Sequence, residues 1–193
     1  RATFSGFALF GRAIFSGTAG FNLATFSSNA ALGRATFSDI AQFEGATFSG
    51  TAGFNGAAFS STAGFDGATF SDIALFGGAT FSGTAGFDGA TFSDIAQFGE
   101  AAFSSTAGFN GATFSSTAWF KGTTFFSTAG FDGATFSGAA WFVEVNFGSE
   151  TISFVSPKQW GPPAPVFDWD QDVSQKPVNV EPQDWPPATA PSS

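Results

Sequence analysis

The chain reads AGFDGATFSDIALFGGATFSGTAGFDGATF over residues 63–92, and this stretch carries the pattern that decides the fold. A phenylalanine recurs at alternating intervals of five and six residues, and a small residue, in most places alanine, stands two positions before it. Two inward positions separated by one outward position is the period of a β-strand. An α-helix does not return to the same face after five or six residues. The pattern extends from Phe4 to Phe147 and predicts a series of short strands.

Four such units make one coil if the coil has four sides, so each residue should lie on its counterpart four units earlier. The chain itself supports this period. The position after Phe21 and its counterparts in later coils is acidic or amide throughout: Asn22, Glu44, Asp66, Asp88, Asn110 and Asp132. The set half a period away is different in kind: Gly11, Gly33, Asn55, Gly77, Gly99, Lys121 and Val143. The sequence therefore predicts about seven stacked coils of this length.

A unit with a small residue, a spacer and a bulky residue, as in Ala2-Thr3-Phe4, resembles the pentapeptide-repeat family, in the phenylalanine-centred variant found in bacterial proteins. The resemblance covers roughly residues 2–148. It implies an all-β fold, a right-handed quadrilateral β-solenoid whose small and bulky residues point inward. The chain departs from the family by using Phe where Leu is commoner and by adding one residue at every second corner.

The composition changes abruptly near Val155, which divides the chain into a solenoid at 1–150 and a C-terminal cap or latch at 151–193. Three tryptophans in the second part are too many for a free linker, so we expect an ordered, extended segment. Trp119 and Trp141 stand one coil apart on one outward face, where exposed indoles are costly. We expect the tail to fold back over them, and the alternative is a partner-binding patch. The tail is marked by Trp160, Pro162, Pro163, Pro165, Phe167, Trp169, Pro177, Pro182, Trp185, Pro186 and Pro187.

The composition argues against catalysis. The chain has no Cys and no His, so it lacks a thiolate nucleophile, the usual general base and the commonest transition-metal ligands. No phosphate-binding loop motif occurs, because the glycines recur as corner residues. We expect no enzyme activity, no cofactor and no metal site. The net charge of −9 opposes direct binding to nucleic acid, and no apolar run reaches the length of a membrane span.

The acidic set forms a ladder along one face of the predicted rod. Neighbouring carboxylates about 5 Å apart repel by roughly 0.8 kcal/mol even in water, so something is expected to offset the repulsion. One interpretation is a surface that mimics nucleic acid and engages a basic groove, another is a cation site, and the third is a solvated face that maintains solubility. The candidate interaction residues here are Glu44, Asp66, Asp88 and Asp132.

A second face carries outward threonines in an unbroken row, including Thr47, Thr69 and Thr91. A regular Thr and Ser array at β spacing is typical of some ice-binding solenoids, which makes ice or crystal-surface recognition one hypothesis. The simpler explanation is that Thr and Ser are β-compatible surface residues copied by duplication.

The function predicted from these features is a non-catalytic structural or protein-interaction scaffold. The predicted partner is a protein, and a second copy of the chain, joined as a homodimer through an end or through the tail, is one candidate. Two alternatives belong to other classes. The resemblance implies an acidic DNA mimic that binds a topoisomerase-type protein, and the Thr and Ser face implies ice binding. The fold alone does not choose among these three.

Overall fold

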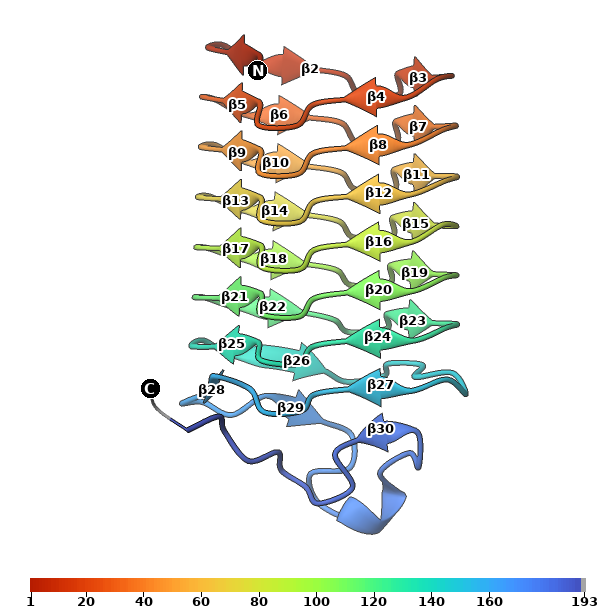
Figure 1. The fold of residues 1–193 in the computed structure, drawn as a ribbon, viewed down its shortest axis with the longest axis vertical. Helices are drawn as coiled ribbons and strands as arrows, with labels where there is room; N and C mark the ends of the chain where they lie inside the picture. The colour runs from red at the N-terminus through yellow and green to blue at the C-terminus, as the bar shows by residue number, and fades with distance from the viewer. Residues whose placement is uncertain (192–193) are drawn as a thin grey trace.

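The computed structural model describes residues 1–191, and they form a rod built from stacked four-sided coils (Figure 1). Each side of the rod is a parallel β-sheet, and each of the first six coils contributes one short strand to every sheet. We call the sheets A, B, C and D in the order in which the chain first visits them. The prediction of an all-β quadrilateral solenoid is confirmed, and the described residues contain no α-helix.

Sheets A and B hold eight strands each. Sheet A contains β1 (Thr3–Phe4), β5 (Thr25–Phe26), β9 (Thr47–Phe48), β13 (Thr69–Phe70), β17 (Thr91–Phe92), β21 (Thr113–Phe114), β25 (Thr135–Phe136) and β28 (Gln159–Trp160). Sheet B contains β2 (Ala8–Leu9), β6 (Ala30–Ala31), β10 (Ala52–Gly53), β14 (Ala74–Leu75), β18 (Ala96–Gln97), β22 (Ala118–Trp119), β26 (Ala140–Phe142) and β29 (Val166–Phe167).

Sheets C and D form the other two sides, and sheet C is the shorter. Sheet C contains β3 (Ile14–Phe15), β7 (Thr36–Phe37), β11 (Ala58–Phe59), β15 (Thr80–Phe81), β19 (Ala102–Phe103) and β23 (Thr124–Phe125). Sheet D contains β4 (Ala19–Gly20), β8 (Ala41–Gln42), β12 (Ala63–Gly64), β16 (Ala85–Gly86), β20 (Ala107–Gly108), β24 (Ala129–Gly130), β27 (Ile152–Ser153) and β30 (Val180–Glu181). A short 3-10 helix, η1, spans Val173–Gln175.

The corners alternate between two lengths, which explains the alternation of five and six in the sequence. The B–C and D–A corners contain two turn residues, and the A–B and C–D corners contain three. In the D–A corner after Phe65, the Ala68 N–H donates to the Phe65 carbonyl at 3.0 Å. The second turn residue, Gly67, has φ of 63°, in the left-handed region that glycine occupies most easily.

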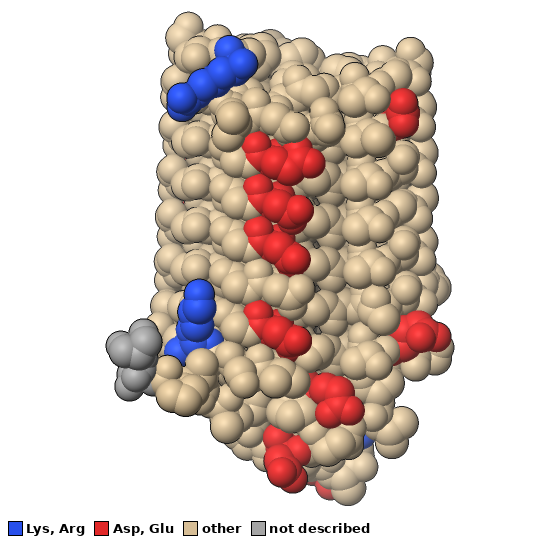
Figure 2. Space-filling model, viewed as in Figure 1, with Lys and Arg blue, Asp and Glu red and all other residues tan. Residues whose placement is uncertain are grey.

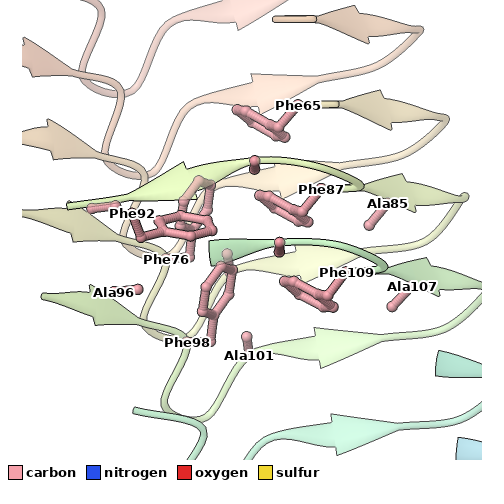
Figure 3. Close-up of a cluster of buried hydrophobic side chains, with 14 of the residues drawn as sticks. Phe65, Phe76, Ala85, Phe87, Phe92, Ala96, Phe98, Ala101, Ala107 and Phe109 are labelled. Carbon is pink, nitrogen blue, oxygen red and sulfur yellow. The ribbon is translucent and has the colours of Figure 1, made fainter. Parts of the chain in front are cut away.

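Stacked phenylalanine rings fill the interior of the rod (Figure 3). Phe65, Phe87 and Phe109 lie above one another with ring centroids 4.9 Å apart and rings parallel within 2°. The ring of Phe76 from sheet B meets Phe65 edge to face at 5.3 Å. Parallel contacts within a column and edge contacts between columns are both favourable geometries for aromatic rings. The alanines fill the remaining interior space, and their small size lets four aromatic columns fit in one coil.

The regular period loosens toward the C-terminus, where the chain builds one further coil. The spacing between sheet partners is constant up to β26, where Ala118 pairs with Ala140. It then lengthens by one residue at each step, because Ala129 pairs with Ile152, Thr135 with Gln159 and Trp141 with Val166. The rod therefore has about eight turns, one more than predicted, because tail strands β27, β28 and β29 continue three of the sheets.

The two ends of the rod differ. At the C-terminal end, Trp169 lies on Phe167 with ring centroids 4.8 Å apart, and Trp185 meets Phe154 edge to face at 6.0 Å. At the N-terminal end no strand lies beyond β1, β2, β3 and β4, so their outer backbone edges are unpaired within the described chain. The rings of the first coil are only partly buried: Phe4, Phe10, Phe15 and Phe21.

Candidate interaction surfaces

The sequence pattern alone places the acidic ladder on a flat side of the rod. In the structure the ladder lies at a corner. Each of its residues is the first of the two turn residues between sheets D and A. Every ladder residue directly follows a bulky core residue, which itself stands two positions after a small one. The backbone of the turn therefore points the ladder side chain outward. Figure 2 shows the acidic atoms as a stripe that runs along the rod over this corner.

The ladder is held together by hydrogen bonds between coils. Asp66 Oδ1 accepts the N–H of Asp88 at 2.9 Å, and Asp88 Oδ1 accepts the N–H of Asn110 at 2.7 Å. Asn110 Oδ1 in turn accepts the N–H of Asp132 at 3.0 Å. Asp132 continues the series by accepting the N–H of Val155 at 2.8 Å. The Asn and Asp members of the ladder therefore each satisfy a backbone donor of the next coil. Glu44 is the exception, and its Oε2 is buried without a hydrogen-bond partner.

These hydrogen bonds answer the question of charge repulsion. A hydrogen bond to a charged acceptor contributes about 1.5–3 kcal/mol. The repulsion between neighbouring carboxylates is smaller, at roughly 0.8 kcal/mol. At the step between Asp66 and Asp88 the hydrogen bond outweighs the repulsion, so this part of the ladder stabilises the stack.

Glycines in sheet D make room for the ladder. The side chain of Asp66 lies across Gly86, and a Cβ at that glycine would come within 2.6 Å of Asp66 Oδ1. Asp88 lies across Gly108 in the same way. Where Ser153 replaces glycine, its hydroxyl donates to Asp132 Oδ1. The outward glycines of sheet D are therefore complementary to the acids of the preceding coil.

The predicted threonine row forms the outer side of sheet A. Thr47 pairs in register with Thr69, and Thr69 with Thr91, so their side chains share one column. The three side chains are half-buried beside their neighbours. The array is regular along the sheet, and the ice-binding hypothesis stays a prediction.

Trp119 and Trp141 lie side by side on sheet B, with ring centroids 5.6 Å apart and an interplanar angle of 12°. The expectation that the tail covers them is wrong. The tail continues sheet B beneath Trp141, where Val166 is its register partner, and it leaves Trp119 36% exposed. A strand that extends the sheet satisfies backbone hydrogen bonds, which a segment lying across the outer side chains would not do.

The B–C corner contains a groove that the sequence reasoning did not single out. The groove has a volume of about 510 Å³ and includes Trp119 in its lining. Its other polar residues come from four different coils, so they come together only in the folded rod. One signal was available, since Glu100 and Glu144 depart from a corner position that is glycine in Gly56, Gly78 and Gly122.

Two titratable groups of the tail have shifted pKa values. Hydrogen bonds from the Ser174 and Gln175 side chains, and then from the Ser174 N–H, lower the pKa of Asp172. Burial lowers the pKa of Lys176, although the nearby Glu181 carboxylate opposes this shift. Within residues 1–191 no group of three or more His, Cys, Asp or Glu side chains is placed to hold a metal ion, and no helix has the length and apolarity to cross a membrane.

Four parallel sheets around a phenylalanine core define a β-solenoid repeat protein. Residues 43–91 and 87–135 match the family model described as pentapeptide repeats (9 copies). The chain belongs to the pentapeptide-repeat family, as the sequence pattern indicated. No curated protein and no solved structure matches the chain. The fold is that of a pentapeptide-repeat scaffold, and scaffolds of this type are generally non-enzymatic.

Proposed function

We propose that this protein is a non-catalytic scaffold that binds a basic protein partner through the acidic ladder at the D–A corner. The observation that supports this proposal is the pair of hydrogen bonds that the N–H groups of Asp88 and Asn110 donate to the carboxylates of Asp66 and Asp88. A carboxylate held in this way loses little conformational freedom when a partner binds, and pre-organisation of this kind improves affinity. The Oδ2 atom of Asp66 is left for a Lys or Arg of the partner, while Oδ2 of Asp88 accepts a long hydrogen bond from Asn110 Nδ2 at 3.5 Å.

Charge supports a basic partner. The stripe holds four acids among its six residues. No cation takes part in it. The one ion pair among the described residues joins Lys121 and Glu144 at another corner. Complementary charge accelerates association and sets the orientation of the partner. Such binding weakens as salt rises, because surface charges are screened.

The experiment compares two variants of equal charge. The stripe variant carries Glu44→Gln, Asp66→Asn, Asp88→Asn and Asp132→Asn, and it keeps the acceptor oxygens that the fold uses, as the natural Asn22 and Asn110 do. The control variant carries Asp72→Asn, Asp94→Asn, Glu150→Gln and Asp184→Asn.

Both variants and the parent chain are used to capture proteins from cell extract over a series of salt concentrations. We expect the stripe variant to lose a salt-sensitive partner that the control retains. The proposal is wrong if both variants capture the same proteins as the parent chain.

A narrower form of the proposal is that the stripe mimics the phosphates of DNA and engages a topoisomerase-type protein. The straight row of ordered carboxylates on a rigid rod supports this form. Its test is supercoiling of plasmid DNA by a type II topoisomerase in the presence of the chain. We expect inhibition by the parent and control proteins and none by the stripe variant. Equal activity with and without the parent chain would contradict the mimic and leave binding to other basic proteins to the capture experiment.

A further inference from the structure

The corner groove between sheets B and C exists because large side chains are missing from the middle of that corner. The turn residues there are Gly77, Gly78 and Gly99, and they form the floor. Asn55 closes the groove toward the N-terminus, and Glu144 lies at its other end. The groove runs along the rod across four coil steps between these two residues, a length of about 19 Å at the usual spacing of strands.

One wall of the groove is an indole held in a fixed orientation. Trp119 stacks on Trp141, which is the next residue in the same column of sheet B. On its other side Trp119 pairs in register with Gln97, whose exposed side chain also lines the groove. An apolar ring face therefore lies beside an amide that can both donate and accept hydrogen bonds.

The lining of the groove also includes two carboxylates at positions where a side chain is conformationally costly. Glu100 and Glu144 have φ of 59° and 56°, in the left-handed region. A residue with a side chain costs roughly 1–2 kcal/mol more than glycine there. Three other turns of this corner hold glycine at the same position. Glu144 pairs with Lys121 at 3.1 Å, and Glu100 has no ion-pair partner among the described residues.

We propose that this groove binds a neutral saccharide chain. The apolar C–H face of a sugar ring fits the indole of Trp119, and its hydroxyls match the amide, carboxylate and ammonium groups of Gln97, Glu100 and Lys121. An apolar ligand would desolvate these polar groups without replacing their hydrogen bonds. A polyanion would meet two carboxylates. An extended peptide has no free strand edge to pair with at a corner. The length of the groove fits several linked rings and not a single sugar.

This site is independent of the acidic ladder, which lies at the diagonally opposite corner of the coil. A saccharide at the B–C corner leaves the D–A corner open to a protein partner. Failure of one proposal therefore does not decide the other.

The test is calorimetric titration of the full chain with linear neutral hexasaccharides of glucose, mannose and N-acetylglucosamine. The monosaccharides and choline serve as comparison probes. We expect at least one hexasaccharide to bind and its monosaccharide to bind at least about tenfold more weakly. Trp119→Ala should reduce the affinity at least about tenfold, and Glu100→Gln should reduce it several-fold.

Leu75→Ala is the matched control, because Leu75 stands in the same column of sheet B as Trp119, two coils away and outside the groove. Its affinity should equal that of the parent chain. Trp119 lies outside the phenylalanine core, so the Trp119→Ala variant should keep a single cooperative thermal unfolding transition, which shows that the fold is intact. The proposal is overturned if no hexasaccharide binds at millimolar concentration, if Trp119→Ala binds as well as the parent, or if choline binds in preference to every sugar.

Discussion

The two ends of the rod solve the same physical problem in different ways. A stack of coils leaves ring faces and strand edges uncovered at each end. At the C-terminal end the chain covers them with Trp160, Trp169 and Trp185. At the N-terminal end Phe7 and Leu9 are 70% and 76% exposed.

Charge distinguishes the two ends as well. Arg1, Arg12 and Arg34 are three of the six cations in the chain, and no acid precedes Asp39. Charged side chains near an exposed strand edge oppose edge-to-edge aggregation. The comparison shows that the C-terminal coil buries large aromatic side chains, whereas the first described coils combine exposed apolar side chains with cations.

The largest expected effect comes from removing the cover. Deletion of residues 157–193 takes Trp160, Phe167, Trp169 and Trp185 away from the core, and burial of one such side chain is worth about 1.5–3 kcal/mol. We expect a loss of several kcal/mol in the free energy of unfolding, with aggregation, as measured by thermal unfolding and size-exclusion chromatography.

Deletion of residues 1–22 is the matched experiment at the other end. It exposes the next coil, which is built in the same way, so we expect a smaller loss and an unchanged elution profile. Equal effects of the two deletions would show that the tail does not act as a cover.

Truncation of single phenylalanine rings compares the middle of the rod with its first coil. Phe81 is fully buried between Phe59 and Phe103, and Phe81→Ala should cost about 3–5 kcal/mol in the free energy of unfolding. Phe4 has a stacked neighbour on one side only, at 4.7 Å, so Phe4→Ala should cost about half as much or less. Denaturant unfolding measures both values. A negligible loss in Phe81→Ala would mean that the ring columns are not the core.

A smaller effect on the free energy of unfolding is expected when one methyl group is added at equivalent glycines of sheet D. Gly86→Ala puts a Cβ within 2.6 Å of Asp66 Oδ1, so it should break the ladder at that step and cost about 1–3 kcal/mol. Gly20→Ala stands at the same position in the first full coil, where the nearest atom is Gln42 Oε1 at 3.7 Å, and it should be nearly neutral.

Thermal unfolding compares the two glycine variants. Adding Asp66→Ala to Gly86→Ala should restore part of the loss, because it removes the clashing carboxylate. Equal stability of the Gly20 and Gly86 variants would contradict the steric role of the ladder.

The smallest effect concerns pH at the covered end. The pKa of Asp172 is lowered below its ordinary value of 3.8 by hydrogen bonds from Ser174 and Gln175. A lowered pKa in the folded chain means that the charged form favours folding above pH 3.8, and that this contribution is lost as the pH falls through the folded value. We expect NMR signals of the tail near η1 to shift below that pH, and the Asp172→Asn variant to lose the transition. Signals of the N-terminal coil, which has no acid, should not change.

The repeating part of the fold could be predicted because one physical rule governs it. Alternation of Ala and Phe at strand period, with outward positions that recur from coil to coil, leaves few ways to bury the rings. The eighth turn was missed because Ile152, Gln159 and Val166 arrive at separations that lengthen by one residue at each step. A growing period does not appear as a repeat in the sequence.

The surfaces were harder to predict than the fold. Residues of one kind that recur at the coil period identified the acidic ladder, the threonine row and the tryptophan pair. The hydrogen bond from Asp88 N–H to Asp66 Oδ1 depends on turn geometry, so the structural part of the ladder's role was not visible. The groove beside Trp119 exists because Gly77 and Gly78 have no side chains to fill it. Such a gap is difficult to recognise in the sequence of a glycine-rich chain.

The ladder also gives the rod a direction of growth. Each acceptor belongs to the earlier coil and each donor to the later one, as in Asp66 with Asp88 and Asp88 with Asn110. A ribosome releases the chain from its N-terminus, and early segments fold before later ones appear. At each of these steps, the coil that emerges meets a side chain already positioned to receive its corner amide. The finished part of the rod acts as a template for the part still being translated.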